Sequence, residues 1–340
     1  MAPKLNGSIV IHRLAGDLGL RSSASPVEAV LSYCQRRVKE FLVDFADCGT
    51  PALLLQFLAN KLSTRLCEIQ TDQELRSLQR EYVSRGETGF ATLVNEFAAD
   101  DTYGITLKLQ KPHFWEPRYV SIVDSRGRKK QRSYHTKWHE LGHLLILTDQ
   151  TRLAYYRNHV QSQSKSAEES LVDVVAGEFS FYAPMIKPHT KGEISFGRIE
   201  EIRSALCPEA SAYSSIMNLA KLWPTPAIWL EAKLARKRSQ EDNGQGSFEF
   251  RQKSLPVLRA IHTLANAAAK ELGLMIIPNF RVPTQSVIHQ VFSSGTDSSS
   301  AREDLSLWCS SDGKRLPKCS VHIEAKRIGE SIHALVRPIS

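Results

Sequence analysis

The sequence predicts an α+β fold in which a small mixed or antiparallel sheet packs on two helices. Two observations support this fold class. The segments 103–109 and 118–124 alternate in polarity or are rich in β-branched residues, which is typical of short strands. The segments 133–147 and 167–182 instead carry apolar residues at helical spacing. Because 340 residues are many for one core, we expect two domains, or one domain with a helical extension.

The elements that precede these strands are predicted from helix signals and apolar periodicity. Residues 26–45 repeat apolar side chains close to the helical period. Thr50 and Pro51 then mark the start of another helix, because threonine caps a first turn and proline lacks an amide hydrogen that this turn leaves unbonded. A short strand is expected at 65–70.

The residues after 190 are predicted to form additions to this core. The segment 191–240 is predicted to be helical in pieces, and 240–247 (QEDNGQGS) has the composition of a linker. Beyond it we expect an apolar-striped helix at 255–272, followed by short strands and turns over 274–340. The strands predicted in this last part include 319–325 and 331–337.

The composition indicates a packed globular protein, with 42% hydrophobic and 24% charged residues. No run of 18 apolar residues is present, so we expect no membrane span, and the apolar run Ile9–Ile11 is too short for a signal-peptide core. A cytoplasmic location is therefore expected. Six cysteines without a Cys-x-x-Cys pair favour free thiols over a disulfide framework or a zinc ribbon.

Two basic runs, 126–132 and 233–238, contribute to a formal net charge of +8. We predict that they form a solvated turn and a helix face. The alternative is direct contact with an acidic partner or a nucleic acid. No zinc-finger, RRM or homeodomain signature accompanies the two runs.

The motif that carries chemistry is the string from Trp138 to Leu145, WHELGHLL. On a helix, His139 and His143 lie four residues apart, so both imidazoles share one face and can bind one metal ion. Glu140 points about 100° away from that face, so we expect it to act as general base toward water at the metal rather than as a ligand. The helix is apolar elsewhere, and polar groups on a half-buried helix need partners.

A metal site of this kind needs a third protein ligand, and the helix predicted at 167–182 offers acidic candidates. Glu169 and Asp173 are again four residues apart. One carboxylate can bind the metal while the other accepts the N–H of a ligating histidine. We expect Glu169 to be the ligand and Asp173 to support a histidine, with Glu168 and Asp173 as alternatives for the ligand. Zn²⁺ suits these ligands, and Mn²⁺ or Fe²⁺ can occupy the same kind of site.

Four further residues near the motif are candidates for supporting roles. Tyr155, Tyr156 and His159 follow the motif closely, where a donor that stabilises the transition state is expected. His135 lies one turn before His139 and is a candidate for a group that supports the ligands. For each of these residues a packing or surface role is the alternative.

The sequence from Lys130 to Leu145 resembles the ImmA/IrrE family of metallopeptidases, in which a helix with HELGHLL follows two strands. Glu169-x-x-x-Asp173 is similar to the second-helix motif of thermolysin-type gluzincins, and Pro184 matches the proline that ends this helix in the family. The resemblance covers about residues 50–190. It departs from the family's pattern at 173–177, where the usual Asn and Ala-Ala positions are replaced.

The resemblance implies a zincin-like core and a zinc-dependent endopeptidase that cleaves a specific protein in a stress or mobile-element response. The expected substrate and partner is a helix-turn-helix transcriptional repressor. The alternatives are a non-catalytic metal-containing protein that regulates a transcription factor by contact, and a zinc hydrolase that acts on another substrate. The predicted divisions of the chain are an N-terminal helical extension (1–49), the metallopeptidase domain (50–190), a helical segment (191–240) and a C-terminal α/β sensor or docking module without catalytic groups (248–340).

Overall fold

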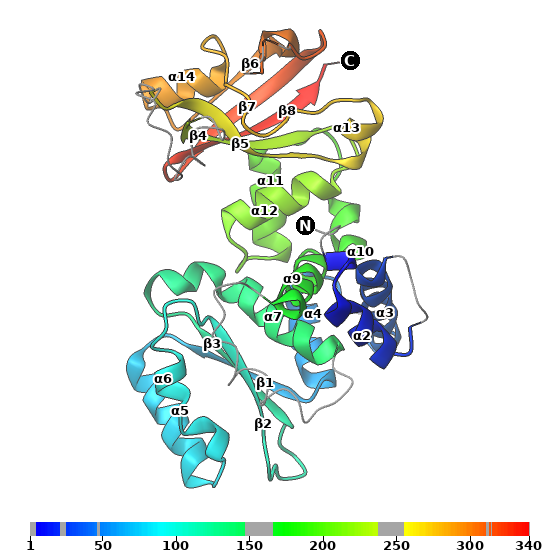
Figure 1. Cartoon of the computed structure of the whole chain (residues 1–340), viewed down its shortest axis with the longest axis vertical. Helices are drawn as coiled ribbons and strands as arrows, with labels where there is room; N and C mark the ends of the chain where they lie inside the picture. The colour runs from blue at the N-terminus through cyan, green and yellow to red at the C-terminus, as the bar shows by residue number, and fades with distance from the viewer. Residues whose placement is uncertain are drawn as a thin grey trace, which may run out of the picture. The chain divides into compact units, whose positions relative to one another are not determined.

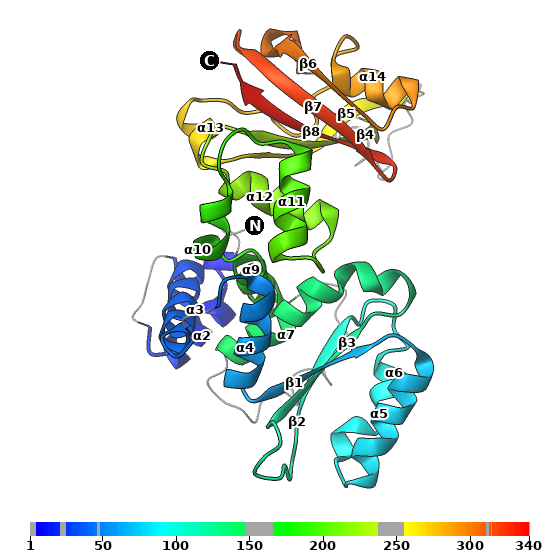
Figure 2. The same ribbon diagram turned by 180° about the vertical axis from the view of Figure 1, so that it is seen from behind.

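The chain has an α+β fold with two separate sheets, as a computed structural model shows (Figures 1 and 2). The structure describes residues 5–20, 25–45, 48–146, 166–236, 255–310, 313 and 315–339. It divides into two compact units. The first contains Met1–Met185 and Leu206–Ser211, and the second contains Ile186–Ala205 and Ala212–Ser340.

Several helices of the first unit begin where the sequence predicted them, and others were not predicted. The helix predicted at 26–45 is confirmed as α3, and the start at Pro51 is confirmed because the Thr50 side chain accepts a hydrogen bond from Leu53 N. A helix at Asp72–Ser84 was not predicted, although Thr71 and Glu74 form a capping box there. The helices up to this point are α2 (Ile9–Asp17), α3 (Pro26–Leu42), α4 (Pro51–Lys61) and α5 (Asp72–Ser84).

Three strands form the sheet of the first unit, and all three were predicted. They are β1 (Thr64–Ile69), β2 (Gly104–Lys108) and β3 (Tyr119–Asp124), in the order β1-β3-β2. Strand β3 pairs in parallel with β1 and antiparallel with β2, so the sheet is mixed. Within the described residues β2 pairs with β3 alone, and it therefore lies at an edge of the sheet.

The two faces of this sheet differ in chemistry. One face packs on α5 and on the short helices η1 (Thr88–Phe90) and α6 (Leu93–Glu96) through an apolar cluster that includes Ile105, Val120 and Ile122. The other face carries hydroxyl groups, because side chains alternate along a strand. Toward this second face lie α7 (Ser133–Ile146) and α9 (Ala167–Ser180), while α5 and α6 lie on the opposite side of the strands (Figures 1 and 2).

The basic run at 126–132 forms the turn η2 (Gly127–Arg132), and two of its cations have structural partners. Arg126 and Lys129 lie 2.8 and 3.0 Å from the buried carboxylate of Asp124. Lys129 also donates to two backbone carbonyls, those of Ala99 and Thr102. Burial raises the pKa of Asp124, but the hydrogen bonds from Arg126 and Lys129 outweigh it and hold that pKa below its usual value. These contacts stabilise the turn that leads into α7.

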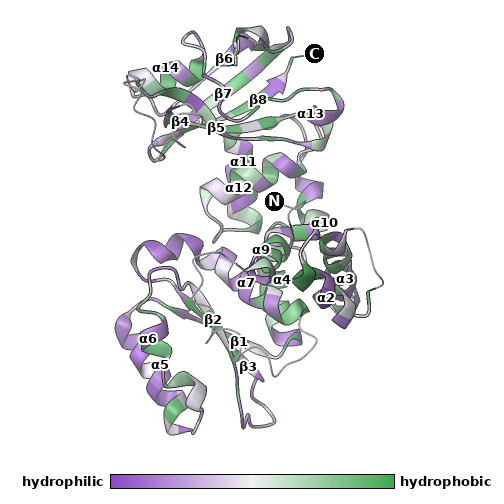
Figure 3. Ribbon diagram, in the orientation of Figure 1, coloured by the Kyte–Doolittle hydropathy of each residue, from purple (hydrophilic) through white to green (hydrophobic). Residues whose placement is uncertain are grey.

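The second unit is built on a five-stranded antiparallel sheet in the order β5-β4-β8-β7-β6. Hydrophobic and hydrophilic residues are interspersed along its strands (Figure 3), and the buried side chains of this unit form one core with α13 and α14. The elements from the unit boundary onward are α10 (Ala183–Ile186), η3 (Lys187–His189), α11 (Phe196–Leu206), α12 (Ala212–Leu222), β4 (Ile228–Ala235), β5 (Val257–Ala265), α13 (Ala267–Glu271), α14 (Val287–Ser294), β6 (Ser298–Asp304), η5 (Leu305–Leu307), β7 (Ser320–Ile328) and β8 (Ser331–Pro338).

Some predictions for this part of the chain were wrong. The helix predicted at 255–272 is strand β5 followed by the one-turn helix α13, and the end of the segment predicted to be helical is strand β4. Pairing with neighbouring strands outweighs the local helical pattern here. The strands predicted at 319–325 and 331–337 are confirmed as β7 and β8.

The predicted division at 240–247 also differs from the arrangement of the strands, although the segment itself lies outside the described residues. Strands β4 and β5 flank it and are neighbours in one sheet, paired from Ile228↔Ala265 to Ala235↔Val257. The structure therefore joins 212–236 and the residues after 255 in one unit. The sheet is antiparallel throughout, so this unit is itself α+β rather than α/β.

Two further expectations can be compared with the structure. The six cysteines are free thiols, as predicted. Among the described residues, no helix combines the length and the apolar character that crossing a bilayer requires.

We expect Asp124→Asn to lower the free energy of unfolding by roughly 3 kcal/mol at pH 7, because two half-buried cations lose the buried anionic partner that they share. The folded-state pKa of Asp124 is depressed, so this contribution is present above the unfolded pKa of about 4 and is lost as pH falls through the folded value. Urea unfolding at pH 7 and pH 3 measures the difference. Arg128→Ala, at an exposed position of the same turn, is the control, and an equal loss in both variants at pH 7 would contradict the assignment.

A protease site inserted within 240–247 tests the arrangement of β4 and β5. After cleavage, we expect two bands on a denaturing gel but one peak in gel filtration, because the β4–β5 ladder holds the pieces together. Two separate folded fragments would instead support a domain boundary at this segment.

Candidate metal centre

Helix α7 positions the two histidines of the motif. Its buried residues include Trp138, Leu141 and Leu145, so the helix packs into the first unit on its apolar positions. His139 and His143 extend from the remaining side, and their rings lie 4.9 Å apart between centroids. His143 is buried and His139 is nearly so, which removes most of the water that would otherwise solvate them.

Helix α9 supplies the third group. Ser166 is its N-cap, and the side chain of Ser166 accepts a hydrogen bond from Glu169 N at 3.1 Å. This cap places Glu169 in the first turn, where the helix dipole favours a negative charge. The carboxylate of Glu169 faces both imidazoles, with one oxygen 3.0 Å from His139 Nε2 and the other 3.4 Å from His143 Nε2.

The separations among these three groups are close to those between neighbouring ligands of one tetrahedral ion, with each carboxylate oxygen of Glu169 facing a different histidine. The two Nε2 atoms are 3.2 Å apart, and the carboxylate contacts are 3.0 and 3.4 Å. Zinc binds nitrogen and oxygen at about 2.0–2.1 Å, so neighbouring ligands of a tetrahedral ion lie about 3.3 Å apart. His139, His143 and Glu169 could therefore hold a metal ion, and they form the one such group among the described residues.

Asp173 orients one of the two histidines. Its Oδ1 lies 2.9 Å from His139 Nδ1, one turn along α9 from Glu169. A carboxylate in this position accepts the Nδ1–H bond, so the lone pair of His139 is on Nε2, the atom that faces His143 and Glu169. The geometry thus selects the tautomer that a metal ligand needs.

The negative charge of Glu169 also favours binding of a cation at this group. Burial raises the pKa of Glu169, but hydrogen bonds and attraction from His139 and His143 outweigh this and hold that pKa far below its usual range. Glu169 therefore carries a negative charge at neutral pH. Its side chain remains 37% exposed, so the group is reached from the side of this carboxylate.

The glycine inside the motif allows the two helices to approach this closely. A Cβ added to Gly142 would lie 3.1 Å from Val172 Cγ1 and 3.4 Å from the Val172 carbonyl oxygen. A larger residue would therefore separate α7 from α9 by a few tenths of an ångström. At the other end of the contact, the Tyr134 hydroxyl donates to the Ser180 carbonyl at 2.8 Å.

Glu140 lies beside this group but takes no part in it. It is buried, and its Oε2 accepts a hydrogen bond of 2.6 Å from the hydroxyl of Thr106 on β2. The strand approaches closely here, since a Cβ on Gly104 would lie 2.6 Å from Glu140 Oε1. Glu140 thus points at the edge strand, while the histidines on either side of it in the motif point at α9.

The other residues singled out in the sequence divide as follows. Glu168 does not belong to the described donor group, whereas Asp173 contacts it through His139. The His135 ring lies 6.4 Å from the His139 ring. Tyr155, Tyr156 and His159 lie outside the described residues.

Sequence reasoning missed the residues that hold Glu140. Thr106 lies within the strand predicted at 103–109, where polarity alternation alone assigns it no role, and Ser121 was not singled out. The signal in the sequence was a serine inside the strand-like run YVSIVD. In the structure every residue of this strand is buried. A lone hydroxyl within a fully buried strand needs a partner.

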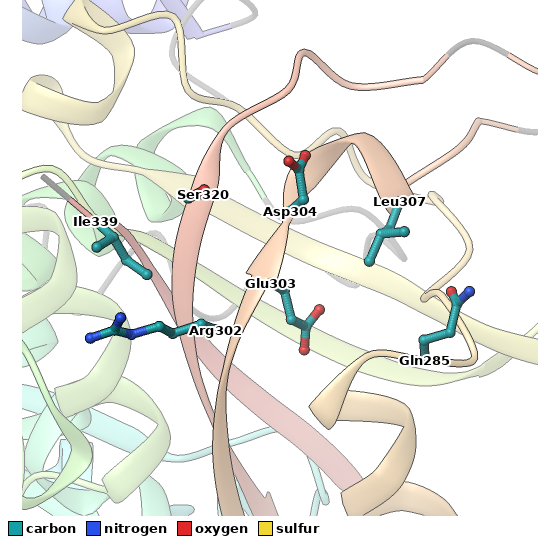
Figure 4. A pocket seen from close by; sticks show the side chains of 7 residues that line it. All are labelled: Gln285, Arg302, Glu303, Asp304, Leu307, Ser320 and Ile339. Carbon is teal, nitrogen blue, oxygen red and sulfur yellow. The ribbon is translucent and has the colours of Figure 1, made fainter.

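A concave region lies in the second unit, with a cavity volume of about 460 Å³ (Figure 4). Two of its carboxylates stabilise local structure: Glu303 accepts from Val287 N at the start of α14, and Asp304 accepts from Ser306 N at the start of η5. Burial raises the pKa of Glu303. The residues that line it are Gln285, Arg302, Glu303, Asp304, Leu307, Ser320 and Ile339.

Comparisons with known proteins add little to this geometry. No family model matches the chain, and no curated protein matches it. A solved structure described as a Mycobacterium tuberculosis transcriptional regulator aligns with 98% of this chain and 75% of its own, at 10% identity and a TM-score of 0.34. A similarity of this size does not establish a shared fold.

We expect Glu169→Ala to abolish stoichiometric metal binding and Asp173→Ala to weaken it by about 10- to 100-fold, because Asp173 acts only through His139. Glu168→Ala is the matched control on the same turn and should bind as the wild type does. Zinc titration against a competing chelator measures all three. Stoichiometric zinc in a His139→Ala, His143→Ala double variant would contradict the site.

Proposed function

We propose that the chain is a zinc-dependent metallopeptidase, with His139, His143 and Glu169 as ligands and Glu140 as general base. The observation that carries the proposal is that the histidines and the glutamate of one motif contact different partners. Its two histidines converge with Glu169 at 3.0–3.4 Å, whereas its glutamate is directed away from them to a hydroxyl of the edge strand. A site that served only to hold the fold together would not need a buried carboxylate held beside it.

A bound zinc ion supplies Lewis acidity, which lowers the pKa of water and polarises a substrate carbonyl. The protein residues do the rest. Asp173 holds the His139 ring so that Nε2 faces the metal position. Glu140 takes a proton from the attacking water and delivers it to the leaving nitrogen, which requires a carboxylate that is fixed but not itself a ligand.

The position of β2 favours a polypeptide as the substrate. This strand lies at the edge of the sheet and carries Gly104 and Thr106, which contact or approach Glu140. An extended chain that adds to a sheet edge is held by backbone hydrogen bonds and so presents its peptide carbonyls in register. A peptide bound along β2 therefore passes the proposed general base.

The finer proposal rests on the resemblance of HELGHLL and Glu169-x-x-x-Asp173 to ImmA/IrrE-type proteases with a zincin-like core. By this analogy the substrate is a single regulatory protein, a helix-turn-helix repressor, cleaved in a stress or mobile-element response. The second unit would then dock the substrate or sense the signal. Mn²⁺ and Fe²⁺ are alternative metals for the same ligands.

Glu140→Gln tests the enzyme. The amide keeps the size of the side chain and can still accept from Thr106, but it cannot take up a proton. We therefore expect normal zinc content, a melting temperature near that of the wild type, and cleavage reduced at least ~100-fold. The probes are peptides from a denatured proteome and the purified candidate repressor, with new termini identified by mass spectrometry.

His143→Ala is the comparison variant and should lose metal, activity and some stability together. If Glu140→Gln cleaves these probes as fast as the wild type, the proposed general base is wrong. If the Glu140→Gln variant also performs the cellular role of the wild type, the chain is not a protease. It is then a non-catalytic protein that regulates a transcription factor by contact.

A further inference from the structure

Three hydroxyl groups, one from each strand of the first sheet, connect in a line to Glu140. Thr106 Oγ1 donates to Glu140 Oε2 at 2.6 Å, and the same Oγ1 lies 2.7 Å from Ser121 Oγ. Ser121 Oγ in turn lies 3.2 Å from Thr64 Oγ1. All three side chains are at least 96% buried, so the line runs through the interior between the sheet and α7.

The direction of each hydrogen bond in the line follows from proton counting. A hydroxyl has one proton, and Thr106 uses its proton on the carboxylate. Ser121 must therefore donate to Thr106, and Thr64 must donate to Ser121. The three O–H groups point the same way, toward Glu140, and hydrogen bonds arranged head to tail in a low-dielectric interior strengthen one another.

The register of the sheet brings the hydroxyls together. Thr106 and Ser121 are directly opposite each other in the antiparallel β2–β3 pair, and β1 flanks β3 on its other side. Their neighbours Ile105, Val120 and Ile122 belong to the apolar cluster on the opposite face. A face meant only for packing would carry valine at these positions, since valine has the shape of threonine without the cost of burying a hydroxyl.

Gly104 restricts the carboxylate from a second direction. A Cβ at this position would lie 2.6 Å from both Glu140 Oε1 and Thr136 Cγ2, so any side chain on Gly104 would displace Glu140. The backbone of β2 thus lies against one carboxylate oxygen while the hydroxyl of Thr106, two residues further along the strand, holds the other.

We propose that Thr106, Ser121 and Thr64 are positioning residues, which fix the orientation of the Glu140 carboxylate through a directed line of hydrogen bonds across the sheet. The catalytic consequence rests on the proposed function, because it takes Glu140 to be the general base. The coupling among the hydroxyls does not rest on the proposed function. The three hydroxyls and the Glu140 carboxylate behave as one coupled unit in the folded protein, with or without metal.

The first test compares Thr106→Val with Thr106→Ser in the zinc-loaded protein, using the peptide mixture as probe. We expect Thr106→Val to bind zinc normally and to lower kcat by about 10- to 100-fold with KM nearly unchanged, because a misplaced base slows the proton transfer and not binding. Thr106→Ser restores the hydroxyl and should recover most of kcat. Thr190→Val, a buried threonine whose hydroxyl bonds the Lys187 carbonyl in the second unit, is the matched control and should leave kcat unchanged.

The second test needs no substrate. The unfolding equilibrium constant of the metal-free protein is measured in urea for Thr106→Val, Ser121→Ala and the double variant. Because the hydroxyls act as a unit, we expect Thr106→Val to raise this constant about tenfold. The factor by which Ser121→Ala raises the unfolding equilibrium constant should then be at least ~threefold smaller in the Thr106→Val background than in the wild type.

The outcomes separate the two proposals. If the wild type cleaves the probe while Thr106→Val keeps the wild-type kcat, or if the two substitutions act additively on unfolding, the positioning line is wrong. Absence of cleavage by the wild type defeats the proposed function alone, and the unfolding cycle still decides the coupling. If Thr106→Val does not fold, Thr64→Val combined with Ser121→Ala measures the same coupling at the other end of the line.

Discussion

The close packing of α7 on α9 is the constraint on which the candidate metal centre depends. Two imidazole nitrogens of α7 and the carboxylate of Glu169 on α9 must meet at contacts of 3.0–3.4 Å, although their side chains differ in length and leave the helices in different directions. Gly142 permits this approach, because any side chain there would press on Val172. In this chain the residue between the i,i+4 histidines must therefore be small, because α9 supplies the remaining group of the candidate site.

The sheet positions Glu140, the residue of the motif that does not face α9. Its apolar face is buried by α5 and α6 and accounts for the packing of the strands, while its other face offers hydroxyls to α7. The positions of the candidate ligands and of the proposed base are thus determined by different neighbours of a single helix. His139 and His143 depend on α9, whereas Glu140, one residue away from His139, depends on β2.

The parts of the site that the sequence could predict are those determined within one helix. The spacing of His139 and His143 is local, and Ser166 three residues before Glu169 indicates where α9 begins. The contacts of Thr106 with Ser121 and Glu140 depend on strand register, which no local pattern reports. The same limit explains β5: its apolar residues fit a helix or a strand equally well by periodicity, and pairing with β4 decides between them.

The register of β2 has a consequence for how such a protein changes over generations. Because side chains alternate along a strand, inserting or deleting one residue of β2 before Thr106 exchanges the two faces of the rest of that strand. The helices that carry the histidines and Glu169 would be untouched by that event. Under the proposed function, a single slip in this edge strand would therefore leave the candidate metal ligands in place and misplace the general base, while the HELGH motif stays intact in the sequence.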